Sequence, residues 1–143
     1  MKKFLIICAV GVGLIIILLS IAIYSNLRRM TAQTQCVWIH TYLVNEIRGG
    51  RVSNEKDAAK VLSNLKIGRG DLLRRNSKGE LVDTWNHPID IKVHFSLLID
   101  VEVRSAGRDG SLGTSDDICL RSSFPKSEIG SPPVNGSVHE MAN

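Results

Sequence analysis

The sequence lacks the residue clusters that mark most enzymes and zinc-dependent folds. Its four histidines are scattered, and it has no nucleophile elbow, phosphate-binding loop or pair of acid–base carboxylates. We therefore expect no enzymatic activity and no small-molecule substrate. Three cysteines are present, without Cys-x-x-C or cysteine–histidine spacing. A disulfide could join only Cys36 to Cys119, but we interpret both as small buried residues.

An excess of charge is also lacking over most of the chain. Lys2, Lys3, Arg28 and Arg29 account for the whole formal charge of +4, and no acidic residue occurs before Glu46. Removing those four from the 18 basic residues leaves 14, which equals the 14 acidic residues. The chain from residue 31 onward is therefore neutral overall and lacks the basic surface that nucleic-acid binding requires.

An uncharged, mostly apolar stretch of twenty residues runs from residue 4 to residue 23. Twenty helical residues span about 30 Å, the thickness of the hydrocarbon core of a bilayer. We interpret the stretch as a membrane-spanning helix, with residues 1–30 forming the anchor and its basic flank. A cleaved signal peptide is the alternative, because Lys2 and Lys3 form a basic start and residues 20–22 could serve as a cleavage site. The length of the stretch favours a retained anchor.

The apolar pattern of a helix continues beyond the anchor. Spacings of three and four residues place one stripe on a single face, made of Ala32, Cys36, Ile39, Leu43 and Ile47. Gly49-Gly50 should end this helix, so anchor and stripe together predict one long helix. A second helix is predicted from an N-cap at Asn54 to a stop at Gly68 and Gly70, followed by a connecting loop over residues 71–79.

Two segments, 89–95 and 99–105, alternate apolar and polar side chains and predict an antiparallel hairpin with one buried face. Residues 119–124 can add a third strand, and the stripe of the long helix is the expected cover. The predicted fold class is α+β, with a long N-terminal helix packed on a small antiparallel sheet. The domain is expected over residues 31–124. Residues 125–143, rich in proline, glycine and serine, are predicted to be a disordered tail.

A loop rich in glycine and aspartate follows the second strand. Asp109, Asp116 and Asp117 place three carboxylates within nine residues. Ca²⁺ takes six to eight oxygen ligands, and clustered negative charges are unfavourable without a cation. The register of an EF-hand fails, because it puts Ser105 and Gly107 where the first two acidic ligands belong. A solvated acidic turn is the alternative interpretation.

Two motifs flank the predicted hairpin. The first is Asp83-Thr84-Trp85-Asn86-His87-Pro88, and the second runs from Ser105 through Asp109-Gly110 to Asp116-Asp117-Ile118. With them, residues 81–118 resemble the C-terminal half of the major pseudopilin of type II secretion systems. In that family D-x-W-G-x-P leads into a hairpin and then into S-x-G-x-D-G-x-x-G-T-x-D-D-I. Asn86 stands in place of the usual glycine, and Asn is the residue other than glycine that best tolerates a left-handed backbone.

The resemblance implies a pilin-like fold and a structural Ca²⁺ ion. The side chains of Asp109, Asp116 and Asp117 would hold the ion, together with main-chain carbonyls from about Ala106 and Leu120. The resemblance also implies a component of a type II secretion or type IV pilus-related machine, whose partners are the membrane and other pseudopilin or secretion-machine subunits.

The expected location is the bacterial inner membrane, with a single span, a cytoplasmic N-terminus and a periplasmic C-terminal domain. Charge does not settle this orientation, because two basic residues lie on each side of the span. The argument rests on calcium, since sites of modest affinity fill in extracytoplasmic compartments.

One departure from the family lies in the first residues. The family carries a basic leader, a glycine and then Phe-Thr-Leu-x-Glu, which the prepilin peptidase reads. Here Phe-Leu-Ile-Ile-Cys follows Lys3 directly, and the early glutamate is missing. The alternative function is therefore a membrane-anchored extracytoplasmic scaffold or binding domain that keeps the fold without polymerising. Peptidase-dependent processing would distinguish the two.

Overall fold

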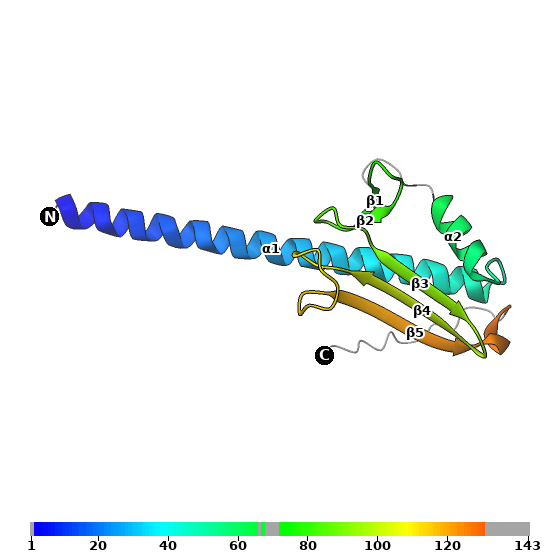
Figure 1. Ribbon diagram of the computed structural model, residues 1–143. Coiled ribbons are helices and arrows are strands. Elements are labelled where there is room, and N and C mark those ends of the chain that lie inside the picture. The colour runs from blue at the N-terminus through cyan, green and yellow to red at the C-terminus, as the bar shows by residue number, and fades with distance from the viewer. Residues whose placement is uncertain (1, 66, 68–71, 131–143) are drawn as a thin grey trace.

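A computed structural model describes residues 2–65, 67 and 72–130, with side chains described from Gly11 onward. The elements in chain order are α1 (Lys2–Arg48), α2 (Glu55–Ser63), β1 (Arg74–Arg75), β2 (Leu81–Val82), β3 (Asp90–Phe95), β4 (Leu98–Ser105), β5 (Ile118–Pro125) and the 3₁₀ helix η1 (Lys126–Glu128). Helix α1 extends as a rod well beyond the domain that its second half helps to form (Figure 1). The predicted α+β arrangement of a long helix on a small antiparallel sheet is confirmed.

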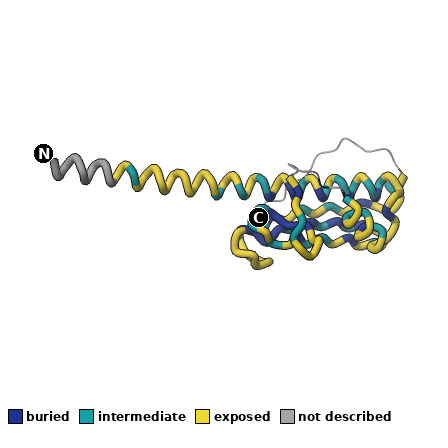
Figure 2. Tube along the Cα trace, turned by 90° about the horizontal axis from the view of Figure 1, so that it is seen from above, coloured by how far each residue is buried: buried dark blue, intermediate teal, exposed yellow. Residues whose placement is uncertain are grey.

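The first half of α1 lies outside the domain. No residue from 11 to 31 is buried, and Figure 2 shows the exposed residues following one another along this half. By length and composition, α1 is the one helix among the described residues that could cross a membrane. Apolar side chains such as Ile16, Leu19 and Ile23 are more than half exposed, so this surface is suited to a lipid environment.

The second half of α1 covers the sheet, where it contacts β4 and β5. The predicted stripe is confirmed, because all five of its residues have no exposed surface. On the facing side Ile99, Val101 and Val103 of β4 are equally buried. Helix α1 ends at Arg48, and Gly50 follows with a φ of 73°, the left-handed conformation that glycine adopts without steric penalty.

Strands β3, β4 and β5 form an antiparallel sheet in that order. Val93 pairs with Val101, and Val101 pairs with Ser122, so alternate residues of the three strands share one face. The three predicted strands are confirmed to within one residue at each end. Helix α2 begins at the predicted N-cap, where the Asn54 side chain accepts a hydrogen bond from the Asp57 N–H at 3.0 Å. It ends at Ser63, before Gly68 and Gly70, which lie outside the described residues.

The predicted connecting loop over residues 71–79 was partly wrong, because β1 lies within it and pairs with β2 in a small antiparallel ladder. Leu73, Leu81 and Val82 belong to the buried core, which explains why this short segment packs against the domain. Gln35 on α1 is also buried and donates a hydrogen bond from Nε2 to the Leu72 carbonyl at 2.5 Å. Two-residue strands are too short to show a period of two in a sequence.

The expected boundary of the domain at residue 124 was also wrong, because the folded chain continues to Gly130. Pro125 belongs to β5, and Ile129 packs against the core. The Arg48 guanidinium donates to Glu128 at 2.8 Å, which ties η1 to the end of α1. Residues 131–143 of the predicted tail lie outside the described residues.

His40 joins α1 to the edge strand β5, and its burial leads us to expect stability that depends on pH. Its Nε2 lies 3.0 Å from the Ser122 hydroxyl, and burial lowers the pKa of its imidazole from 6.5. The unfolded chain therefore binds more protons than the folded chain just below pH 6.5. We expect thermal unfolding of the fragment from residue 28 to residue 130 to occur at lower temperature as the pH falls through this range. His40→Gln should remove this dependence, and an unchanged pH profile in the variant would contradict the assignment.

Candidate metal centre

The candidate metal loop connects β4 to β5 and comprises residues 106–117. It begins with a close approach between its two ends, since a Cβ placed on Gly107 would lie 2.4 Å from the Asp116 carbonyl oxygen. No side chain fits at that distance, and the φ of 62° at Gly107 also favours glycine. The loop is therefore closed at its base.

The three predicted carboxylates lie in this loop, and each accepts hydrogen bonds from it. Asp116 Oδ2 accepts from the backbone N–H groups of Arg108 at 2.7 Å and Asp109 at 3.2 Å. Asp117 Oδ2 accepts from the Gly113 N–H at 2.7 Å. Asp109 Oδ1 accepts from the Ser111 N–H at 2.8 Å. These bonds fold the loop back on itself.

Of the three carboxylates, that of Asp116 accepts the most hydrogen bonds. The Thr114 hydroxyl, 2.7 Å from Oδ1, lowers the pKa of this carboxyl most, and the N–H groups of Asp109 and Arg108 lower it further. Thr114 Oγ1 also lies 3.4 Å from Asp117 Oδ1, so one hydroxyl stands between two carboxylates. Hydrogen bonds to the charged form keep Asp116 ionised at neutral pH.

Of the two expected carbonyl ligands, Ala106 lies at the start of the loop, whereas Leu120 lies beyond its end. Ala106 is buried directly after β4, and Leu120 lies within β5, opposite Val103. Oxygen donors of this kind suit a hard cation such as Ca²⁺. Among the described residues, however, no three His, Cys, Asp or Glu side chains converge in a way that could hold a metal ion. The donor types thus fit calcium, while the side chains are arranged for hydrogen bonding to the loop itself.

A buried carboxyl supports the base of the loop. Asp83 has no exposed surface and accepts three hydrogen bonds: from the N–H groups of Trp85 and His87, each at 2.9 Å, and from the Ser105 hydroxyl at 2.6 Å. It therefore joins the turn over residues 83–88 to the last residue of β4. Asn86 in this turn has a φ of 71°, in agreement with the left-handed conformation expected there.

His87 contacts the candidate metal loop, which the sequence did not predict. Its Nδ1 lies 2.9 Å from the Gly107 carbonyl oxygen. A Cβ on Gly110 would lie 2.9 Å from the His87 Nε2, so the ring fits against the loop only because residue 110 is glycine. The turn over residues 83–88 and the candidate metal loop are thus packed together. In the sequence, the only indication of this contact was that the D-x-W and D-G motifs occur in the same chain.

The structure corrects the interpretation of the cysteines. Cys36 is buried, whereas Cys119 is exposed, and both are free thiols. Burial is the main cause that raises the pKa of the Cys36 thiol to about 12, with Asp83 nearby as a smaller cause. Cys119 alternates with the inward-facing Ile118 and Leu120, which places it on the outer face of the sheet.

The outer face of the sheet brings together three residue types found in hydrolases. The register places His94, Asp100 and Ser123 side by side on β3, β4 and β5. The Ser123 hydroxyl donates to Asp100, while His94 Nδ1 lies 3.3 Å from Glu55 of α2. Because the aspartate lies between the other two, the histidine does not accept the serine proton, and the row lacks the arrangement of a catalytic triad.

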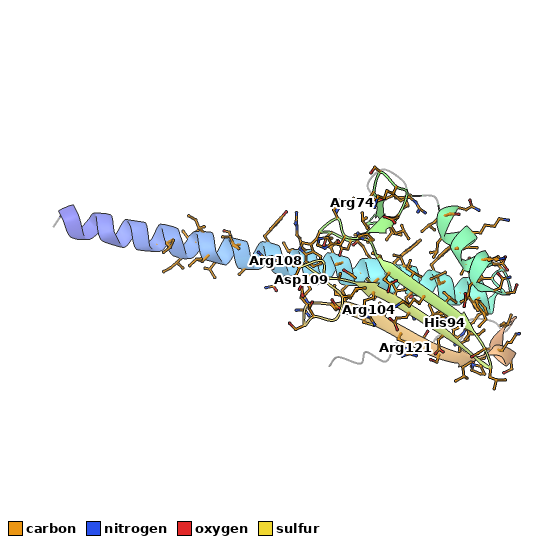
Figure 3. The ribbon with its side chains drawn as sticks, in the orientation of Figure 1. Arg74, His94, Arg104, Arg108, Asp109 and Arg121 are labelled. Atoms are coloured by element: carbon orange, nitrogen blue, oxygen red, sulfur yellow. The ribbon has the colours of Figure 1, made fainter. Side chains whose placement is uncertain are left out.

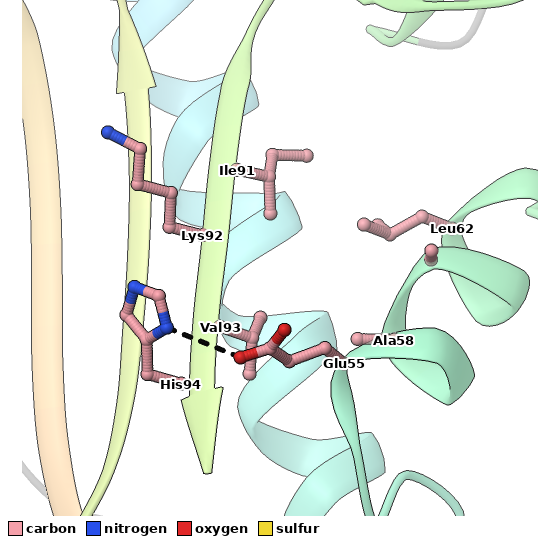
Figure 4. A pocket seen from close by; sticks show the side chains of 8 residues that line it. Glu55, Ala58, Leu62, Ile91, Lys92, Val93 and His94 are labelled. Atoms are coloured by element: carbon pink, nitrogen blue, oxygen red, sulfur yellow. Dashed lines mark hydrogen bonds and ion pairs between the residues drawn. The ribbon is translucent and has the colours of Figure 1, made fainter.

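A shallow pocket of about 280 Å³ lies between α2 and β3. In Figure 4, Ala58 and Leu62 of α2 face Ile91 of β3 across it, and the contact between Glu55 and His94 marks one end. The pocket holds no group of convergent polar side chains beyond that exposed contact, among the residues described around it. It therefore contributes no chemistry to the candidate site.

Comparisons of the chain with protein-family models, with curated proteins and with solved structures found no match.

Proposed function

We propose that the protein is a pseudopilin-like component of a type II secretion or type IV pilus-related machine. The observation that carries the proposal is the division of α1. No residue of α1 from 11 to 31 is buried, while its second half buries one stripe against a three-stranded antiparallel sheet. A helix that serves first as an anchor and then as the core of its domain matches the architecture that the resemblance over residues 81–118 implies.

We further propose that α1 anchors the protein in the bacterial inner membrane, with the N-terminus in the cytoplasm and the domain in the periplasm. The length and apolar surface of α1 support a single span. The periplasmic side is supported by the calcium argument alone, because a loop of modest affinity requires the calcium concentrations found outside the cytoplasm.

The surface of α1 that faces away from the sheet is the proposed contact for neighbouring subunits. Trp38 is 45% exposed and stacks on Tyr42, with ring centroids 5.4 Å apart. Exposed aromatic side chains are enriched in protein interfaces because they bury a large area with little loss of conformational entropy. This pair lies on the helix that also carries the anchor, so subunits held in one membrane can present it to each other.

The second candidate function is an anchored scaffold or binding domain that does not polymerise. This function is favoured because no acidic residue occurs before Glu46, so the sequence lacks the early glutamate that the family carries. Cross-linking in membranes distinguishes the two, with Trp38→Cys as the probe and Cys8→Ala and Cys119→Ser removing competing thiols. Because each chain then has one reactive thiol, subunits packed against each other give a cross-linked dimer from Trp38→Cys and none from Leu97→Cys at the far turn. A scaffold gives no dimer from either position.

Calcium binding by Asp109, Asp116 and Asp117 is the proposed role of the loop. We expect excess Ca²⁺ to stabilise the fragment from residue 28 to residue 130 by about 2.7 kcal/mol at a hundredfold excess over Kd, because the ion binds the folded chain preferentially. Mg²⁺ should stabilise it much less, since it requires stricter geometry and gives up its waters reluctantly. The measurement is the melting temperature with each ion and with a chelator.

Two variants sharpen this test. Asp117→Ala removes a proposed ligand and should abolish the response to calcium. Glu102→Ala is the matched control, because Glu102 lies on the outer face of β4, pairs with Arg104 at 2.7 Å and is not itself a proposed ligand. Equal melting temperatures of the unmodified fragment in calcium and in chelator would mean that the loop is an acidic turn closed by its own hydrogen bonds.

A further inference from the structure

The position at which α1 leaves a membrane is marked by a tyrosine and an arginine. The Arg28 guanidinium carbon lies 4.8 Å from the centre of the Tyr24 ring, and Tyr24 is 58% exposed. Tyrosine is enriched at the level of the lipid headgroups, and arginine side chains near span ends extend toward the same level. Because a helix rises 1.5 Å per residue, Arg28 lies about 6 Å beyond Tyr24.

The domain begins at this same level. The Thr84 hydroxyl donates to the Arg28 carbonyl at 3.1 Å, and the Arg74 guanidinium reaches the Thr84 carbonyl at 3.5 Å. His87, in the same turn as Thr84, contacts Gly107 of the candidate metal loop. Figure 3 shows Arg108 and Asp109 at the end of the domain nearest the half of α1 that lies outside it. The loop therefore lies beside the point where the helix enters the domain.

This end of the domain carries a group of arginines, which we call the basic end: Arg28, Arg29, Arg74 and Arg108. Arg29, Arg74 and Arg108 are exposed. Leu112 in the same loop is 48% exposed and offers an apolar side chain beside them. The opposing charges are Asp109, Asp116 and Asp117, whose carboxylates accept hydrogen bonds from the backbone of their own loop.

We propose that the basic end binds the headgroups of anionic phospholipids. The inference rests on the proposed membrane anchorage, since the span would hold this end at the headgroup level. Guanidinium groups form paired hydrogen bonds with phosphate oxygens, and basic residues near a span are attracted to anionic lipid surfaces. The contact would fix the tilt and rotation of the domain relative to the membrane, beyond what a single helix can specify.

The test compares two exposed leucines at opposite ends of the sheet in the full chain. Leu112→Cys probes the basic end, and Leu97→Cys probes the β3–β4 turn, where Leu97 is 92% exposed. Both are made with Cys8→Ala and Cys119→Ser, while the buried Cys36 is retained. An environment-sensitive fluorophore is attached to each, and the chain is placed in vesicles of phosphatidylcholine with or without phosphatidylglycerol.

We expect quenching of the label at residue 112 by headgroup-labelled lipid when phosphatidylglycerol is present. The quenching should weaken at high salt, and the label at residue 97 should show none. Arg108→Glu should reduce the ratio of lipid-contacting to free label at least about fivefold, because the variant loses one basic residue near an anionic surface and gains a carboxylate that the surface repels. Arg121→Glu is the matched control, because Arg121 is an exposed arginine on the outer face of β5.

The outcomes separate this inference from the proposed anchorage. If the chain stays in the vesicles after alkaline extraction but residue 112 responds equally in neutral and anionic lipid, the anchorage stands and the headgroup contact is wrong. If Arg108→Glu and Arg121→Glu behave alike, the contact is likewise overturned. If alkaline extraction releases the chain, both the anchorage and the contact fail.

Discussion

Ile39→Ala lowers the free energy of unfolding by about 2–5 kcal/mol, the range for truncating a fully buried aliphatic side chain. Ile39 has no exposed surface and lies in the middle of the stripe that α1 packs against β4 and β5. Its truncation leaves a cavity between helix and sheet that neither element can close, because each is held by its own backbone hydrogen bonds. The measurement is urea unfolding of the fragment from residue 28 to residue 130.

Thr41→Ala is the control for this variant. Thr41 lies two residues further along α1 and is exposed, so its replacement should change stability by no more than about 0.5 kcal/mol. If the two variants unfold at the same urea concentration, α1 does not form the core of the domain. The division of the helix into an anchor and a packed half would then be lost, and with it the main support for the proposed function.

The elements predicted correctly are those with a long periodic pattern. The stripe on α1 repeats over four helical turns, and the segments 89–95 and 99–105, which became β3 and β4, alternate apolar and polar residues along almost their whole length. Each of these patterns has enough repeats to exclude other periods. The N-cap at Asn54 and the stop at Gly50 were also predictable, because capping depends on single residues with few alternatives.

The features that the sequence did not predict correctly have local physical causes. The β1–β2 ladder is too short for a period, and it is ordered by Gln35, whose burial on a helix face no local rule predicts. Ile129 is an isolated apolar residue in a polar segment, so its packing on the core depends on where β5 ends. The exposure of Cys119 could have been predicted, because alternation along the strand from the inward-facing Ile118 places residue 119 on the outer face of the sheet.

For the candidate site, the sequence located the loop but not its internal bonding. Asp109, Asp116 and Asp117 lie in one loop, but among the described residues no three such side chains converge in a way that could hold a metal ion. Their partners are backbone N–H groups, and the identity of those partners depends on the loop conformation and not on residue type. The role of Asp83 was hidden for the same reason, because an aspartate before a turn is exposed far more often than it is buried.

Asp83→Ala is expected to destabilise the domain by about 3–5 kcal/mol, because the carboxyl is fully buried and accepts three hydrogen bonds. Removing the carboxyl leaves the buried N–H groups of Trp85 and His87 and the Ser105 hydroxyl without their acceptor. An unsatisfied buried donor costs about 1–3 kcal/mol, and the three losses are not fully additive because they share one site. The measurement is urea unfolding of the fragment from residue 28 to residue 130.

Two controls identify the cause. Asp83→Asn keeps the size and one acceptor oxygen, so it should lose roughly half as much stability as Asp83→Ala. Asp90→Ala removes a partly exposed carboxylate whose ion pair with Lys92 spans 3.1 Å, and such a pair contributes at most about 1 kcal/mol. In Asp83→Ala the backbone amides of residues 105–110 should also exchange hydrogen faster, since Ser105 begins the loop that Asp83 supports. Unchanged exchange there, together with a loss of stability below about 1 kcal/mol, would show that the turn and the loop are held by other contacts.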